Sequence, residues 1–171
     1  MFGWLIALIT FPGIILHEWA HKFFCDRTHV PVHKICYFRL GNPAGYVIHD
    51  QVDNYGKAFL IATAPFLVNT VIAVILFFIA IIIPLGLITY LFCWLGISIA
   101  MHAFPSSEDA DGLWHYSKKV WWRNPLVIFG FPLIGLIKLA GMLSAIWFDL
   151  LYAVALLILV GFLAKGSTFF F

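Results

Sequence analysis

Five residues, "HEWAH", hold the side chains of this chain that are best suited to chemistry. His17, Glu18 and His21 form the pattern H-E-x-x-H inside the apolar stretch "GIILHEWAHKFF". Residues four apart lie on the same face of a helix, about one turn apart, so both imidazoles can reach one tetrahedral zinc ion. The glutamate between them then lies beside the metal. The spacing therefore predicts a Zn²⁺ site with His17 and His21 as ligands.

The chemistry expected of such a site is metal-assisted hydrolysis. Zinc lowers the pKa of a bound water to about 7, and a neighbouring carboxylate can take the proton as the water attacks a carbonyl. We expect Glu18 to be this general base and to pass the proton on to the leaving amine. The alternative is a polar patch at the membrane interface, hydrogen-bonded to neighbouring helices. An ionisable side chain at mid-bilayer costs roughly 2.5–3.5 kcal/mol, which favours a bound ligand.

A catalytic zinc needs a third protein ligand and one open position. The acidic run "SSEDADG" offers Asp109 and Asp111, which are two apart and cannot face the same way on a helix. We favour Asp109 because it lies closer to the apolar segment 85–104. The alternative is that Asp109 forms a capping box with Ser106 and leaves Asp111 for the metal. We expect His102, also near this edge, to line a water path, with zinc ligation and stabilisation of a tetrahedral intermediate as alternatives.

The composition of the chain indicates a membrane protein. Hydrophobic residues make up 63% and charged residues 11% of the 171 residues, whereas soluble proteins have roughly 45–50% and 25%. A soluble domain of this size could not cover so much apolar surface. The net charge of +2 gives no footprint for nucleic acid, and the three cysteines have no metal-finger spacing. We expect a single membrane-embedded domain spanning residues 1–171, with free thiols.

The apolar windows predict an all-α integral membrane protein with four transmembrane helices, or five. A span needs about 20 apolar residues, and four segments meet this length, with the first kinked at Pro12 and Gly13: about 2–24, 58–83, 85–104 and 139–164. The segment 126–137 is too short and is predicted to be re-entrant or interfacial. Between the first two spans, "GYVIHD" follows a turn and indicates a small strand-containing insert.

The basic residues predict the orientation. The loops after the first and third spans lie on one side of the membrane, and with their flanks they hold eight of the ten basic residues: Lys22, Arg27, Lys34, Arg39, Lys57, Lys118, Lys119 and Arg123. The positive-inside rule makes this side cytoplasmic. We therefore expect a multi-pass protein of the cell membrane, with its N-terminus outside and its active site nearer the cytoplasm.

Three motifs resemble the site-2 protease family of intramembrane zinc metalloproteases. These are "HEWAH" in a membrane helix, "YGKAFLIATAP" entering the next span, and "AFPSSEDADG" leaving a third. The resemblance covers about residues 13–112, and "HEWAH" matches the family's ligand motif without change. It implies that His17 and His21 bind zinc and that Glu18 is the base. The "GYVIHD" stretch is similar to the strand-forming insert of the family, whose exposed edge can pair with substrate.

The chain departs from the family pattern at the third ligand. The family has an asparagine, a proline-rich turn and then Asp-Gly. Here Asp111 keeps the Asp-Gly pair, while Asp109 lies closer to "FP". Asn69 follows "AP" one position later than in the family, so we assign it no role.

The resemblance implies a zinc metalloendopeptidase that cleaves membrane proteins or membrane peptides in or near their transmembrane segments. Its partners would be such substrates and the lipid bilayer, without nucleic acid. Two alternatives remain. One is a membrane zinc hydrolase of another amide or ester. The other is a non-catalytic scaffold or chaperone that keeps the fold, against which the intact Glu18 argues.

Overall fold

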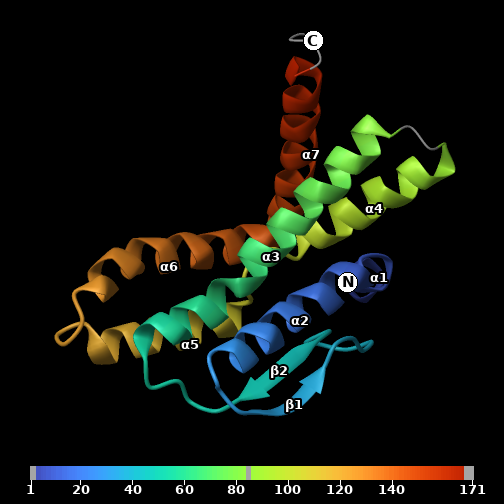
Figure 1. Cartoon of the computed structure of the whole chain (residues 1–171). Coiled ribbons are helices and arrows are strands. Elements are labelled where there is room, and N and C mark those ends of the chain that lie inside the picture. Colours follow the sequence, from blue (N-terminus) through green and yellow to red (C-terminus); the bar gives the residue numbers. More distant parts are fainter. Residues whose placement is uncertain (1–2, 84–85, 168–171) are drawn as a thin grey trace.

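The computed structural model describes residues 3–83 and 86–167 and is mostly helical (Figure 1). Its elements are α1 (Gly3–Ile9), α2 (Phe11–Arg27), β1 (Val32–Cys36), β2 (Tyr46–His49), α3 (Tyr55–Ile82), α4 (Leu87–Met101), α5 (Ser107–Val120), α6 (Leu126–Leu143), a 3₁₀ turn η1 (Ser144–Ile146) and α7 (Phe148–Ser167). The helical class and the strand-containing insert are thus confirmed. Residues 2 and 85, where two predicted spans begin, lie outside the described residues.

The predicted first span consists of two helices, and the break falls at Thr10, just before the predicted kink. The Thr10 hydroxyl donates to the Ile6 carbonyl at 2.7 Å, which closes the end of α1. Pro12 lies in the first turn of α2, where its missing N–H removes no helical hydrogen bond. A Cβ on Gly13 would lie 2.1 Å from the Ser98 carbonyl oxygen, so glycine lets α2 and α4 approach closely.

Helix α3 confirms one apolar span. Asn54 caps it by accepting from the Lys57 N–H at 3.1 Å, and its 28 residues run through Pro65. Among the described residues it is the one unbroken helix long and apolar enough to cross a membrane. Helix α4 ends at Met101 and has 15 residues, shorter than the predicted segment 85–104. Its length is about 22 Å, against about 30 Å for the hydrocarbon layer.

The predicted boundary between segments 126–137 and 139–164 is wrong. Helix α6 continues through Lys138 for 18 residues, and the chain bends at η1 and Trp147, whose φ is +67°. The ammonium group of Lys138 pairs with the Asp111 carboxylate at 2.5 Å, so its charge does not require the helix to end. Residues Val127–Leu143 and Phe148–Ala164 together form a further candidate span, bent by 106°.

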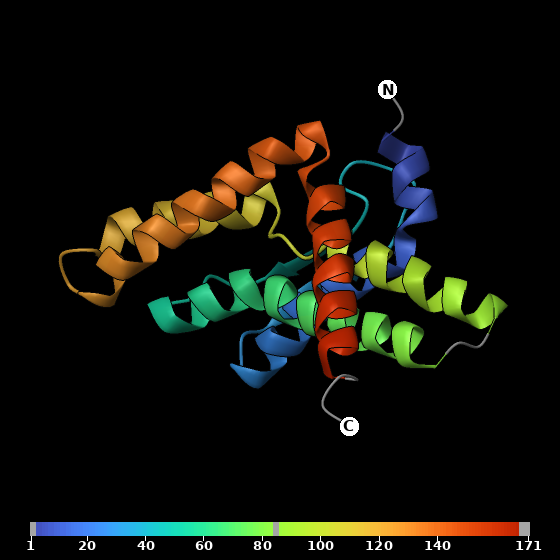
Figure 2. The same ribbon diagram turned by 90° about the horizontal axis from the view of Figure 1, so that it is seen from above.

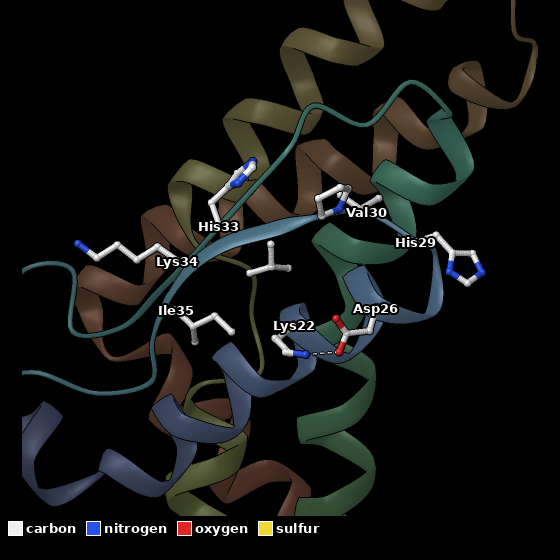
Figure 3. Close-up of a pocket in the computed structure, with 9 residues that line it drawn as sticks. Lys22, Asp26, His29, Val30, His33, Lys34 and Ile35 are labelled. Atoms are coloured by element: carbon white, nitrogen blue, oxygen red, sulfur yellow. Dashed lines mark hydrogen bonds and ion pairs between the residues drawn. The ribbon is translucent and has the colours of Figure 1, made fainter.

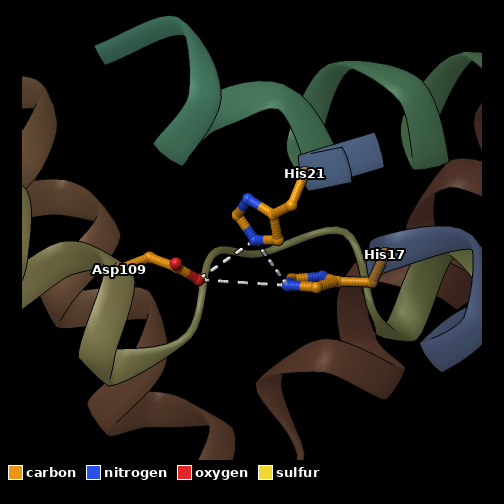
Figure 4. A group of neighbouring side chains, drawn as sticks. All are labelled: His17, His21 and Asp109. Carbon is orange, nitrogen blue, oxygen red and sulfur yellow. Dashed lines mark hydrogen bonds and ion pairs between the residues drawn. The ribbon is translucent and has the colours of Figure 1, made fainter. Parts of the chain in front are cut away.

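The helices form a bundle around α3 with a protruding hairpin. Helices α2, α3 and α4 pack together, and α7 crosses α3 and α4 (Figures 1 and 2). The core between them contains Ala73, Phe77, Ile99, Ala100 and Val160. Strands β1 and β2 are antiparallel, with Ile35 opposite Val47, and they lie along α2. Helices α5 and α6 run side by side away from the bundle, and the first turn of α5 lies near α2 (Figures 1 and 4).

Candidate metal centre

The two histidine rings of α2 point their Nε2 atoms at one another. The distance between His17 Nε2 and His21 Nε2 is 3.2 Å, and both residues are buried. His17 Nδ1 lies 2.8 Å from the His102 carbonyl oxygen, and His21 Nδ1 lies 3.0 Å from that of Ile61. A carbonyl oxygen only accepts, so each Nδ1 must carry the proton. In the neutral rings both Nε2 atoms then present lone pairs to the same space.

Asp109 brings a carboxylate to this space from the first turn of α5 (Figure 4). Its Oδ2 lies 3.2 Å from His21 Nε2 and 4.0 Å from His17 Nε2, and one ligand atom from each of the three residues lies within 4.8 Å of the others. Asp109 also forms the capping box, since its Oδ2 accepts from the Ser106 N–H at 3.0 Å. The capping box and the approach to the histidines are thus not alternatives, because the carboxylate makes both.

The electrostatics of the cluster fit a cation. Burial alone would raise the pKa of Asp109, but the charge and hydrogen bond of His21, with smaller contributions from His17 and Ser106, hold it well below its usual range. Asp109 is therefore ionised at neutral pH. When both rings are neutral, two lone-pair nitrogens and an anionic oxygen repel one another unless a positive charge lies between them, which a proton on His21 or a metal ion can supply. Two imidazoles and one carboxylate are also a donor set of catalytic zinc sites.

Glu18 is buried beside the histidines, under the loop that precedes β2. A Cβ on Gly45 would lie 2.7 Å from Glu18 Cγ and 2.8 Å from Glu18 Oε1. The backbone of this loop therefore touches the Glu18 side chain, and a larger residue at position 45 would displace that side chain. The β1–β2 insert thus covers the predicted base.

Asp111 lies outside the cluster. Its exposed carboxylate pairs with Lys138, and the hydrogen bond from that ammonium group lowers the pKa of Asp111. The His102 ring lies 2.8 Å from the Thr10 hydroxyl, whereas the His102 carbonyl contacts His17. His102 therefore reaches the candidate site through its backbone.

Sequence reasoning missed the residues that orient the histidines. Asn69 is fully buried and its amide nitrogen donates to the carbonyls of His102 at 2.8 Å, Ile99 at 3.3 Å and Gly13 at 3.4 Å. This amide joins α3 to α2 and α4 behind His17. The available signals for Asn69 were its position inside an apolar run and its place after "AP", one position later than in the family. The Ile61 carbonyl leaves no signal in the sequence at all.

Two cavities lie near this end of α2. One, of about 460 Å³, opens beside Asp109 and is lined by polar residues that include His49, Asp53 and Tyr116. The other, of about 530 Å³, lies between the end of α2 and β1 and includes the Lys22–Asp26 ion pair (Figure 3). In the described part of the chain, its lining contains none of the four predicted site residues. The first cavity is lined by Asp109, one member of the cluster.

Comparisons of the chain with protein-family models, with curated proteins and with solved structures gave no match. The resemblance to the site-2 protease family stays a prediction from the motifs. The structure adds a specific geometry: His17 and His21 on α2 and Asp109 on α5, far away in the sequence, turn ligand atoms toward one another. This arrangement can hold a metal ion next to a carboxylate.

Proposed function

We propose that this chain is a membrane-embedded zinc metallopeptidase that cleaves peptide bonds in or near transmembrane segments. The observation that carries the proposal is the convergence of His17 Nε2, His21 Nε2 and Asp109 Oδ2, with ligand atoms within 4.8 Å of one another. A non-catalytic scaffold has no need of a buried carboxylate beside such a cluster, and Glu18 supplies one.

Each residue has a distinct task in this proposal. His17, His21 and Asp109 would hold the ion, and the carbonyls of His102 and Ile61 fix the ring orientations. A bound Zn²⁺ supplies a Lewis acid and makes water a nucleophile at neutral pH. Glu18 accepts the proton of the attacking water and delivers it to the leaving amine.

The membrane setting explains the need for an aqueous cavity. The proposal keeps four or five crossings in one domain, an outside N-terminus and a cytoplasmic site, as the basic residues predict. The cavity of about 460 Å³ beside Asp109 is lined by the loop after β2, by α3 and by α5, and it would admit water from the cytoplasmic side. Backbone bonds of a substrate helix are satisfied internally, so the substrate must unwind locally before cleavage.

The test compares wild type, Glu18→Gln and Asp26→Asn after purification and reconstitution. Asp26 lies on the same helix but pairs with Lys22 at the surface, so its variant is the matched control. Zinc is measured by elemental analysis, and cleavage of a panel of transmembrane peptides by mass spectrometry. We expect all three proteins to hold zinc and Glu18→Gln to lose at least about 100-fold in turnover.

Two results would overturn the proposal. Folded wild-type protein without zinc would remove the metal chemistry. Equal cleavage by wild type and Glu18→Gln would exclude Glu18 as the base. Glu18-dependent hydrolysis of small amides or esters, with all transmembrane peptides intact, would instead indicate a different zinc hydrolase.

A further inference from the structure

Helix α6 buries one face and exposes the other. Val127 and Ile134 are fully buried toward α5 and α3, and a Cβ on Gly130 would lie 2.0 Å from the Tyr55 hydroxyl. The opposite face is apolar and exposed, with Phe129 at 80% and Met142 at 75% exposure; the exposed large side chains are Ile128, Phe129, Leu133, Leu136, Leu139 and Met142. Such a continuous apolar face is a site of interaction.

The neighbour of α6 is a polar helix. Helix α5 runs along the buried face of α6 (Figure 2). Asp111 pairs with Lys138, and the rings of Trp114 and Phe131 lie 5.1 Å apart. The exposed residues of α5 include charged and polar side chains: Glu108, Asp111, His115, Lys118 and Lys119. A helix with these charges cannot enter hydrocarbon without a large cost. While it is paired with α5, α6 therefore cannot cross the bilayer.

The junction between α6 and α7 gives the direction of α6. The two helices meet at 106°, with Trp147 in the left-handed region at the corner. Helix α7 packs in the bundle against α3, the long apolar helix. If α7 is steep in the membrane, this angle places α6 close to the membrane plane.

The free end of the α5–α6 hairpin carries basic and aromatic residues. Lys118, Lys119 and Arg123 lie at the end of α5 and in the turn that follows. The rings of Trp121 and Trp122 lie 4.0 Å apart, and Trp122 is 78% exposed. Tryptophans prefer the lipid–water interface, and lysines and arginines there attract anionic headgroups.

We propose that the α5–α6 hairpin rests on the anionic surface of the bilayer, with the outward face of α6 buried at the boundary between headgroups and acyl chains. Helix α5 then lies on the aqueous side, and the basic tip contacts anionic lipid. The proposal rests on the membrane embedding in the proposed function, not on the protease activity. Because Asp109 is in the first turn of α5, the bilayer would support the helix that carries the third metal ligand.

The test measures the depth of spin labels in vesicles of phosphatidylcholine and phosphatidylglycerol. Cys36 and Cys93 are replaced by serine, while Cys25 is buried and stays. Single cysteines then replace Ile128, Leu139, His115 and Ile158. Depth is read from collisions with oxygen, which concentrates in hydrocarbon, and with a water-soluble nickel chelate. Photolabelling of the unaltered chain by a lipid-borne diazirine repeats the test without substitutions.

The outcomes separate three arrangements. We expect labels at 128 and 139 at the same shallow depth, 115 in water and 158 deep, with diazirine adducts on α6 and none on α5. The positions 128 and 139 lie on one face of a helix and about 16 Å apart along it, so a difference in depth of that order would make α6 a span and overturn the proposal. Labels at both positions in water, with 158 deep, would also overturn it. If 158 is in water too, the membrane embedding itself fails.

Discussion

At the scale of single residues, the choice of third ligand can be tested directly. Asp109→Asn should weaken zinc binding by at least about 100-fold, because an amide oxygen is a poor substitute for an anionic ligand. The variant keeps an acceptor for the Ser106 N–H, so the cap of α5 is retained. Asp111→Asn should keep its zinc, because its partner is Lys138. Elemental analysis after gel filtration distinguishes the two, and loss of zinc in Asp111→Asn alone would assign the ligand to Asp111.

The contact between Gly45 and Glu18 gives a second residue-scale prediction. Gly45→Ala places a methyl group 2.7 Å from Glu18 Cγ, so the base must move. A misplacement of this kind costs about 100-fold in rate, and we expect a drop of roughly 10- to 100-fold in turnover with zinc content unchanged. Gly41→Ala in the same loop is the control, since its nearest neighbour is a flexible Arg39 atom at 3.6 Å. Equal activity of the two variants would show that the loop does not position Glu18.

The sequence could indicate the side chains of the site but not its backbone partners. The H-E-x-x-H spacing placed His17 and His21 on one face, and the structure has their Nε2 atoms 3.2 Å apart. Depth in the chain favoured Asp109, which is the aspartate that reaches them. The contacts of the Ile61 carbonyl and of Gly45 depend on how distant segments pack. Backbone groups are the same in every residue type, so the sequence has no signal for such contacts.

At the scale of elements, the amide of Asn69 is the joint between α2, α3 and α4. Asn69→Asp replaces a donor by oxygens that face three carbonyls, and we expect at least about 2 kcal/mol of lost stability. Asn54→Asp makes the same chemical change at the N-cap of α3, where aspartate accepts from the Lys57 N–H equally well. Thermal unfolding in detergent should show a clear loss for the first variant and almost none for the second. Equal unfolding temperatures for the two variants would show that the Asn69 amide does not hold the three helices together.

Hydropathy predicted the existence of the elements better than their ends. The apolar run 58–83 ends one residue after α3, which begins three residues earlier than predicted, at Tyr55, because Asn54 caps it there. Lys138 suggested a boundary that does not exist, since its partner Asp111 is 27 residues away. The real corner at Trp147 depends on one left-handed residue in an apolar stretch, which has no hydropathy signal.

At the scale of the whole molecule, composition indicated a membrane protein, and the structure confirms one long apolar helix among the described residues. The number of crossings is a different matter. Counting apolar residues assumes straight helices, but this chain breaks its first segment at Thr10, shortens α4 to 15 residues and bends by 106° after α6. Four or five crossings and the orientation stay predictions.

A metal ion at the proposed site would join α2 to α5, which are far apart in the sequence. His17 and His21 are on α2 and Asp109 is on α5, with the sheet, α3 and α4 between them in sequence. Zinc should therefore stabilise the whole fold, by about 2.7 kcal/mol when free zinc is 100 times its dissociation constant.

Thermal unfolding in detergent, with a chelator or with added zinc, measures this stabilisation. The shift should disappear in His21→Ala and persist in His33→Ala, whose ring is exposed and pairs with Asp50. Hydrogen exchange should show the largest zinc-dependent protection in the first turn of α5, because the metal replaces mutual repulsion of three lone-pair donors with bonds that hold Asp109 against α2. Zinc-dependent protection confined to the exposed loops would place the metal elsewhere. A zinc-dependent rise in unfolding temperature that persists in His21→Ala would likewise show that the stabilising zinc does not bind at this cluster.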